Sequence, residues 1–234
     1  MINVVCVLKS GPTWLPEYVY KLRDMVGRNL RIPHRFVCLS DIEIDVDQTI
    51  PLQPLVSTKF VPPFWYKMQL FRPDIKWQDP VVFFDLDVVI KGDITNIIET
   101  LYKHDFAMIQ SPYRENQSNS SFMWWQGDYS WLWEIFRRRT AFEWQTIYND
   151  AGAGGKYGDQ GFIADYVYHQ QIQDLVDSNR IAKVGKRETG NWCDVVIFAG
   201  KRKPWQMIGH PDVDKYWLTN NEYKEYYDNK HNIV

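Results

Sequence analysis

The feature that most constrains this chain is an apolar segment, residues 81–90, that contains two carboxylates. Valine, phenylalanine, leucine and isoleucine fill every position of the segment except Asp85 and Asp87. A run of this kind predicts a strand that is buried on both faces. Because side chains alternate along a strand, we expect Asp85 and Asp87 to point to the same side, a few ångströms apart.

Two buried carboxylates held this close need a positive partner. Burying a charged group away from water costs free energy, and two like charges repel each other. A divalent cation offsets both effects, and hard ions such as Mg²⁺ and Mn²⁺ take oxygen ligands. The pair therefore predicts a site for Mn²⁺ or Mg²⁺ on Asp85 and Asp87.

Composition favours a soluble globular protein with one sizeable core. The chain has 234 residues, of which 45% are hydrophobic and 24% charged. A formal charge of −2 argues against a protein whose main work is wrapping bare nucleic acid. No apolar stretch is long enough to span a bilayer, and the first residues lack the features of a signal peptide. Three cysteines without Cys-x-x-Cys spacing favour reduced thiols, so we expect a cytoplasmic protein.

The N-terminal part of the chain predicts a β-α-β unit. Residues 3–8 and 35–39 are the expected strands, and a helix is expected to begin at about Pro16, a residue suited to the first helical position. Such units are normally right-handed and parallel, with a ligand crevice at the carboxyl ends of the strands. The buried stripe of the helix is expected to comprise Val19, Leu22, Met25, Val26 and Leu30.

Further helices and strands are expected beyond this unit. Residues 42–63 are expected to be irregular, and the glycine-rich segment 151–155 lacks the lysine and hydroxyl residue of a P-loop. The overall pattern predicts an α/β protein with a mixed, mostly parallel central sheet flanked by helices. The expected elements are a short helix over 64–71, a helix carrying Ile94 to Leu101, strands over 106–109 and 121–125, a helix with Trp131 to Phe136 capped by Asp128, a helix from Gly158 to about Val176, and a strand over 194–198.

Four motifs in order carry a family resemblance. They are Asp85-Leu86-Asp87, Asn119-Ser120-Ser121-Phe122-Met123, Gly158-Asp159-Gln160 and Gly200-x-x-Lys203-Pro204-Trp205. They resemble the metal-binding Asp-x-Asp, the Asn-Ser-Gly-Val-Met strand, the Asp-Gln helix opening and the Gly-x-x-Lys-Pro-Trp diphosphate loop of GT-A glycosyltransferases, specifically the glycogenin-like retaining group called family eight. The matches extend from Val4 to Trp205.

The resemblance implies one Rossmann-like GT-A domain over residues 1–234. Its nucleotide-binding half is expected at about residues 1–92, its donor-sugar and acceptor half at about 93–212, and a C-terminal tail at 213–234. One departure concerns the metal, because the family carries a metal-binding histidine three residues before the glycine of the diphosphate loop. That position is Ile197 here, and Ala199 lies beside the glycine. His210, just after the loop, is an alternative third ligand, and water is another.

The resemblance also implies roles for individual residues. Asp159 and Gln160 are expected on the sugar face as catalytic residues. A role of Asp159 as a transient nucleophile stays open, and the residue also suits a helix N-cap. Asn119 is expected to contact the donor sugar. The remaining expected donor-binding residues are Lys67 near the donor, Leu8 and Tyr18 on the uracil side, Asp41 near the nucleoside, Asp85 at the metal, and Gly200, Lys203 and Trp205 in the diphosphate loop.

The implied activity is metal-dependent transfer of a hexosyl or pentosyl group from a nucleotide sugar, most plausibly a UDP-sugar, with retention. Sugar transfer passes through an oxocarbenium-like state. Positive charge and hydrogen-bond donors at the leaving diphosphate would stabilise that state. A metal on Asp85 and Asp87 would supply the charge, and Lys203 and the backbone amides after Gly200 would be further donors. The acceptor stays open between a glycan, a protein side chain and a hydroxylated DNA base. Whether the protein forms a homodimer is open as well.

Two other functions compete with this interpretation. Phe84-Asp85-Leu86-Asp87 also resembles the aspartyl-nucleophile motif of haloacid-dehalogenase-like phosphatases, but that motif normally ends the first strand of its fold, and a β-α-β unit precedes it here. The 11 tryptophans suggest a non-catalytic sugar-binding module. Such a module would not need paired buried carboxylates. Basic clusters at residues 137–139 and 201–203 could grip phosphate locally.

Overall fold

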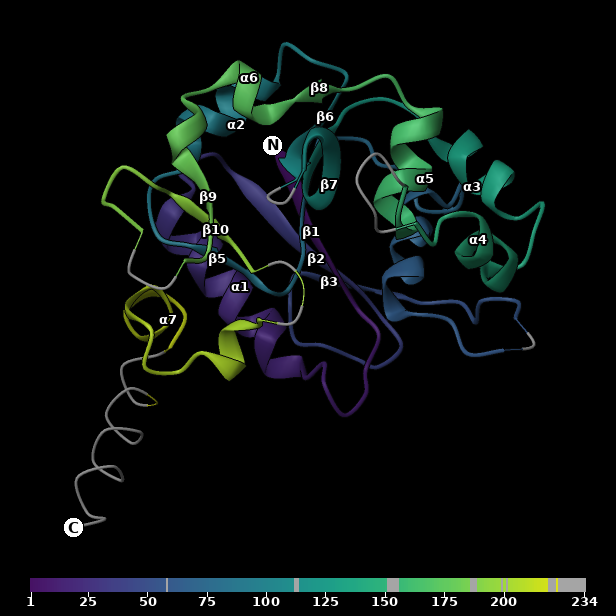
Figure 1. Cartoon of the computed structure of the whole chain (residues 1–234), viewed down its shortest axis with the longest axis horizontal. Helices are drawn as coiled ribbons and strands as arrows, with labels where there is room; N and C mark the ends of the chain where they lie inside the picture. The colour runs from purple at the N-terminus through teal and green to yellow at the C-terminus, as the bar shows by residue number, and fades with distance from the viewer. Residues whose placement is uncertain are drawn as a thin grey trace.

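The computed structural model describes residues 1–57, 59–111, 114–150, 156–185, 189–198, 200, 202–218 and 222, with the side chains of 114–116 left aside. The glycine-rich segment 151–155, Ala199, Lys201 and most of the C-terminal tail lie outside these residues. Two β-sheets and their covering helices make up the described structure (Figure 1).

A seven-stranded sheet forms the centre of the fold, in the order β3-β2-β1-β4-β7-β6-β8. Strands β1, β2, β3 and β4 run parallel, and β6 is parallel to β8; β7 is antiparallel to both of its neighbours. The expected mixed, mostly parallel sheet is therefore confirmed. The strands are β1 (Ile2–Leu8), β2 (His34–Ser40), β3 (Gln48–Pro51), β4 (Val81–Phe84), β6 (Phe106–Ser111), β7 (Arg114–Trp125) and β8 (Gln170–Gln171).

A smaller sheet of three strands lies beside the first, in the order β5-β10-β9. Its strands are β5 (Val88–Ile90), β10 (Val195–Ile197) and β9 (Ile181–Lys183). β10 pairs antiparallel with β5 and parallel with β9. Because β5 follows β4 closely in the chain, the backbone passes directly from the large sheet into the small one.

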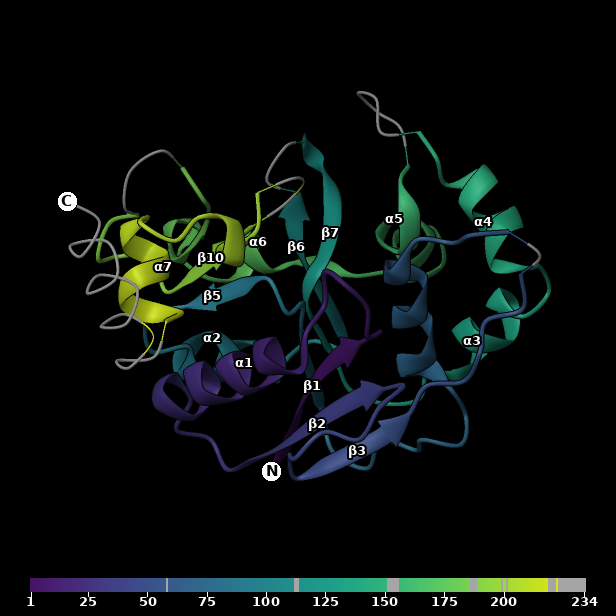
Figure 2. The ribbon, with the colours of Figure 1, turned by 90° about the horizontal axis from the view of Figure 1, so that it is seen from below.

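Helices cover both faces of the large sheet (Figure 2). On one face lie the small sheet and the helices α1 (Pro16–Asn29), α2 (Thr95–Leu101), α6 (Ile172–Leu175) and α7 (Pro211–Tyr216). On the other face lie the 3₁₀-helix η1 (Pro63–Phe71) and the helices α3 (Ser130–Phe136), α4 (Ala141–Ile147) and α5 (Gly158–Tyr166). Two short 3₁₀-helices, η2 (Ser178–Arg180) and η3 (Pro204–Gln206), complete the described elements.

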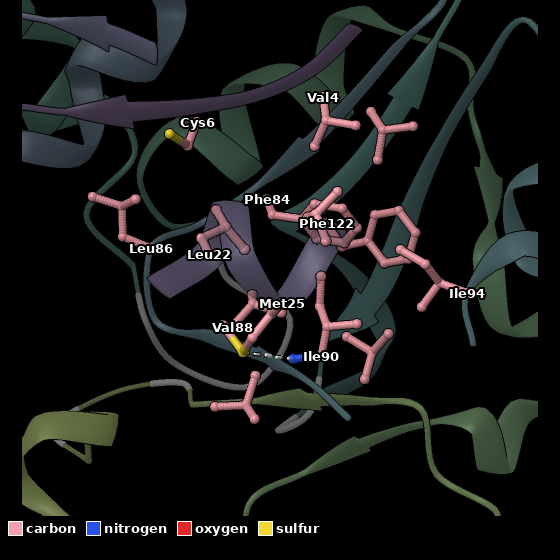
Figure 3. Packing of buried hydrophobic residues seen from close by; sticks show 14 of the residues in the cluster. Val4, Cys6, Leu22, Met25, Phe84, Leu86, Val88, Ile90, Ile94 and Phe122 are labelled. Carbon is pink, nitrogen blue, oxygen red and sulfur yellow. Dashed lines mark hydrogen bonds between the residues drawn. The ribbon is translucent and has the colours of Figure 1, made fainter. Parts of the chain in front are cut away.

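Each face of the large sheet has its own hydrophobic core. Along β1, Val4 and Cys6 pack into the core under α1, whereas Val5 packs into the core under η1 and α5. Figure 3 shows the first core, where Phe84 and Phe122 lie with ring centroids 4.5 Å apart. The buried side of α1 is the expected stripe of Val19, Leu22, Met25 and Val26, with Leu30 just past its end.

The structure corrects the prediction of a single strand over residues 81–90. β4 ends at Phe84 and β5 begins at Val88, so Asp85, Leu86 and Asp87 form the turn between two sheets. Apart from Asp85 and Asp87 the run is apolar because both short strands are buried, and Leu86 between them is buried in the same core as β5. Two short buried strands in succession produce the same apolar sequence pattern as one long buried strand.

The helix that begins at Gly158 is shorter than expected, because it ends at Tyr166 instead of continuing to Val176. Phe162 packs into the core under η1, whereas Ile172 packs into the core on the opposite face of the sheet. One straight helix could not reach both, so the chain crosses between them through β8. The expectation of an irregular segment at 42–63 missed β3, and α4 was not expected from the sequence at all.

Two further observations concern the cysteines and the helices. Cys6, Cys38 and Cys193 are all buried, and none is in a disulfide. Within the described residues, every helix is too short or too polar to cross a lipid bilayer.

Candidate active site

Most of the sequence-predicted residues converge on a pocket at the carboxyl ends of β1 and β4, where parallel sheets commonly bind ligands. The pocket has a volume of about 240 Å³. A larger cavity of about 430 Å³, beside Trp77 and Trp125, is lined among the described residues by one carboxylate, Asp128, and by the cations Arg72 and Lys76. The first pocket is lined by Val7, Lys9, Trp14, Pro63, Phe64, Lys67, Asp85, Leu86, Asp87, Asn119, Ser120, Ser121, Tyr157, Asp159, Gln160, Phe198, Gly200 and Lys203.

Asp85 and Asp87 reach the pocket from the turn between β4 and β5. The Asp85 amide donates to the Ser121 carbonyl at 2.9 Å, which fixes the start of the turn against β7. The Asp87 carboxylate is buried and pairs with Lys203. Burial raises the pKa of Asp87, the nearby Asp85 raises it further, and Lys203 opposes both effects.

Lys67 links three residues that lie far apart in the sequence. Its Nζ lies 3.0 Å from Asp85 Oδ1, 3.0 Å from Asp159 Oδ2 and 2.8 Å from Ser120 Oγ. The Ser120 hydroxyl also donates to Asp159 at 2.6 Å. Burial alone would lower the pKa of Lys67, but the carboxylates of Asp159 and Asp85 outweigh it and raise that pKa above its ordinary value. Lys67 is therefore a permanent cation of the site.

Asp159 and Gln160 come from the first turn of α5, next to the middle of β7. The Asn119 amide donates to Gln160 Oε1 at 3.0 Å, and Asn119 Oδ1 accepts from the Ser121 amide at 2.8 Å. Gly158 has φ +61, and a Cβ placed there would lie 2.8 Å from the Phe64 ring. Glycine therefore allows both the tight entry into α5 and the close approach of Phe64.

The loop after β10 brings Gly200 and Lys203 to the pocket, but not Trp205. Gly200 has φ +77, a conformation that glycine adopts without strain. Trp205 instead stacks on Tyr18, with ring centroids 4.2 Å apart and an interplanar angle of 5°. Tyr18 is buried in the core, so neither Tyr18 nor Trp205 lines the pocket; the nearby indole that does is Trp14.

Two residues expected on the nucleoside side are also placed differently. Leu8 is fully buried under α1, and its neighbours Val7 and Lys9 line the pocket instead. Asp41 does not line the pocket; it accepts from the Ser10 amide at 2.7 Å and pairs with Lys9. Burial would raise the pKa of Asp41, but these partners lower it. Asp41 thus fixes the loop that follows β1.

His210 caps a helix and does not line the pocket. Its Nδ1 accepts from the Asp212 amide at 3.3 Å at the start of α7, and its Nε2 is buried without a hydrogen-bond partner. Ile197, at the expected histidine position, is buried in β10. Across the described part of the chain, no group of three or more His, Cys, Asp or Glu side chains could hold a metal ion.

The donor atoms present nevertheless suit a hard divalent cation. Asp85 and Asp87 bring carboxylate oxygens to one pocket, and oxygen ligands are those that Mg²⁺ and Mn²⁺ prefer. Mg²⁺ commonly keeps several waters and binds through one or two carboxylates together with substrate phosphates. Two protein ligands are therefore enough for a cation that is bound with a diphosphate.

Sequence reasoning missed several residues that line the pocket. Lys9 follows the end of β1, and Tyr157 directly precedes Gly158-Asp159-Gln160, so proximity to a strand end or a motif could have indicated both. Trp14 and Phe64 carry no such signal. Their places depend on how the loop before α1 and the start of η1 pack against the sheet.

Comparison with known proteins supports the fold. No protein-family model matches the sequence, and no curated protein matches it. Solved structures do match: the galactosyltransferase LgtC, in complex with donor and acceptor sugar analogs, aligns over 97% of this chain and 95% of its own, with a TM-score of 0.52 and 13% identity.

Two further matches are longer proteins. The bifunctional glycosyltransferase WbbM aligns over 97% of this chain and 51% of its own, with a TM-score of 0.62 and 11% identity. The glycosyltransferase GlyE of Streptococcus pneumoniae TIGR4 aligns over 98% of this chain and 65% of its own, with a TM-score of 0.58 and 11% identity. This chain therefore has the GT-A fold of the glycosyltransferases.

Proposed function

We propose that this protein is a glycosyltransferase that moves a hexosyl or pentosyl group from a nucleoside diphosphate sugar, UDP-linked, to a hydroxyl acceptor. The observation that carries the proposal is the Lys67-centred network with Asp85 and Asp159, which shares a pocket with the Asp87–Lys203 pair on a GT-A fold. The expected order of motifs along the chain supports the same activity.

We further propose that the transfer depends on Mn²⁺ or Mg²⁺ held by Asp85 and Asp87. When bound, the cation would supply positive charge to the diphosphate. Lys203 already lies in this part of the pocket, beside Asp87 and 3.4 Å from the Phe198 carbonyl, so its ammonium can donate to a phosphate oxygen. Prealigned donors of this type typically contribute several kcal/mol to lowering a barrier, about 3–4 kcal/mol for a single donor.

The donor sugar would lie against Asn119, Asp159 and Gln160. Their side chains are held by one another, by Ser121 or by Lys67, so they bind the sugar hydroxyls without reorganising. Lys67 pairs with Asp159 at 3.0 Å and fixes its side chain, which suits a carboxylate that orients the sugar and stabilises positive charge at the anomeric carbon. Such positioning can contribute about 7–11 kcal/mol in well-oriented systems.

We propose retention of the anomeric configuration, by attack from the side of the leaving group. The bond from the anomeric carbon to the β-phosphate oxygen breaks, and a bond to the acceptor oxygen forms on the same face. The departing phosphate oxygen takes the acceptor proton. This route needs no protein base, and in the described pocket both carboxylates nearest the sugar side, Asp85 and Asp159, are already engaged by Lys67.

Ligand binding and turnover test the proposal together. UDP with Mn²⁺ is expected to raise the melting temperature of the protein, because a ligand that binds only the native state stabilises it. Asp87→Asn should abolish that shift and reduce transfer at least 100-fold, while Asp174→Asn, an exposed carboxylate on α6, should change neither. Full activity of Asp87→Asn would refute the assignment. Proton NMR of the product's anomeric coupling tests retention separately.

A further inference from the structure

Beyond the donor site, the pocket has an aromatic wall formed by Phe64 and Tyr157. Both side chains are half-buried, both line the pocket, and their ring centroids lie 5.8 Å apart at an interplanar angle of 53°. Neither ring takes part in the proposed donor chemistry. Because a half-buried aromatic pair at a pocket leaves apolar surface exposed, it is a candidate ligand surface.

The wall is held in place by the same elements that hold the catalytic groups. Phe64 and Lys67 are three residues apart on the 3₁₀-helix η1, where side chains three apart lie on one side, about 6 Å apart along the axis. Tyr157 directly precedes the first turn of α5, which carries Asp159 and Gln160. The wall therefore adjoins the two elements, η1 and α5, that carry Lys67, Asp159 and Gln160.

Gly158 fixes the distance between the two elements. Its missing Cβ leaves room for Phe64 Cε2, which would lie only 2.8 Å from a Cβ at that position. Phe64 also packs near Trp65, whose indole donates to Gln145 at 2.8 Å. The ring of Phe64 is thus positioned by rigid neighbours, as a specific binding surface requires.

The described cations that line the pocket, Lys9, Lys67 and Lys203, are each in an ion pair. Lys67 pairs with Asp159, and Lys156, next to Tyr157, pairs with Asp165. Arg137 pairs with Glu134, Arg139 lies over Trp144, and no residue of 137–139 lines the pocket. The described lining of the pocket therefore offers no unpaired lysine or arginine for the phosphates of DNA, whose binding depends mainly on such charges.

We propose that Phe64 and Tyr157 form the acceptor subsite and that the acceptor is a pyranose ring of a glycan. The slightly positive C–H face of a pyranose packs on the negative face of an aromatic ring. A hydroxyl of a ring bound there faces the donor sugar held by Asn119, Asp159 and Gln160. The proposal rests on the proposed glycosyltransferase function and adds the class of its acceptor.

The test compares Phe64→Leu, which keeps apolar bulk but removes the ring, with Tyr157→Phe, which keeps the ring but removes the hydroxyl. Tyr168→Ala, which truncates an aromatic side chain that is 88% exposed and outside the pocket, is the matched control. UDP release from a panel of UDP-sugars is measured with Mn²⁺, first without acceptor and then with methyl pyranosides, a Ser/Thr peptide, or duplex DNA containing 5-hydroxymethylcytosine.

A methyl pyranoside is expected to stimulate UDP release by the wild type. Phe64→Leu should raise the KM for that pyranoside at least ten times more than the KM for the donor, and Tyr157→Phe should have a smaller effect. Equal effects on both KM values would make the wall part of the donor site and overturn the proposal. Stimulation by the peptide or the DNA alone would also overturn it.

Saturation-transfer NMR separates failure of this inference from failure of the proposed function. Methyl pyranosides are mixed with wild type and with Phe64→Leu, without any nucleotide sugar. A saturation signal in the wild type that weakens at least fivefold in Phe64→Leu would support the subsite even if no UDP-sugar were turned over. Equal signals in the two proteins would refute it, whatever the enzyme assays show.

Discussion

Lys67 on η1 and Asp159 on α5 form a buried ion pair, with 3.0 Å between Nζ and Oδ2 and both side chains more than nine-tenths buried. The pair joins two elements on the same face of the large sheet and reaches Asp85 at the end of β4. A buried pair of this kind rarely adds much net stability, but removing one partner leaves an uncompensated charge. The pair therefore makes the site and the fold depend on each other.

Replacing Lys67 by methionine should destabilise the protein by about 3–5 kcal/mol, because it leaves Asp85 and Asp159 without their cation. Urea denaturation measures the effect. Lys9→Met is the matched control, since the Lys9–Asp41 pair is partly exposed and such pairs contribute about 1 kcal/mol or less. In the double variant with Asp159→Asn, part of the loss should be recovered, because one of the two uncompensated carboxylates is gone while Asp85 remains. Similar losses for Lys67→Met and Lys9→Met would contradict the buried network.

The contribution of Lys67 to stability should not change across neutral pH. The carboxylates of Asp159 and Asp85 raise its folded-state pKa above the ordinary 10.5, in spite of its burial. A cation with a raised pKa contributes its full stability below the unfolded pKa and loses it only as pH rises through the folded pKa. The difference in unfolding free energy between wild type and Lys67→Met should thus be constant from about pH 6 to 9. A difference that shrinks within that range would show that Lys67 titrates earlier.

Two glycines should respond to alanine in opposite ways. Gly158→Ala should destabilise the protein by about 1–2 kcal/mol or more, because φ is +61 and the new Cβ would meet the Phe64 ring. Gly27→Ala should stabilise it by about 0.5–1 kcal/mol, because Gly27 lies inside α1 with open space around its Cα. Thermal unfolding of both variants measures the effects. The assigned backbone at Gly158 is wrong if its alanine variant melts at or above the wild-type temperature.

His210 should contribute to the stability of the protein and not to metal binding. His210→Ala removes the cap of α7 and should cost about 0.5–2 kcal/mol, whereas His210→Asn keeps a capping acceptor and removes the unpartnered Nε2. The asparagine variant should therefore be the more stable of the two. Titration of UDP with Mn²⁺ by calorimetry should give the wild-type affinity for both variants. A tenfold loss of affinity in both would restore His210 as a metal ligand.

The sequence by itself determined the parts of this protein that depend on local patterns. Pro16 and the stripe from Val19 to Leu30 define α1, and the apolar runs on either side define β1 and β2. The short motifs at Asp85, Asn119, Asp159 and Lys203 predicted that these four residues share a site, and all four line one pocket. Local backbone preference and the alternation of side chains act over a few residues, so they can be read directly from the chain.

Only the tertiary structure decided which side of the sheet each segment faces. The turn at Asp85 transfers the chain from one sheet to another, and the crossing after Tyr166 ends α5. In both places the apolar residues before and after the change look alike in the sequence, although they pack in different elements. The same cause turned Tyr18, Leu8 and Trp205 toward the core and brought Trp14 and Phe64 to the pocket. Buried positions are apolar in every part of the fold. The sequence therefore indicates that a side chain is covered, but not which element covers it.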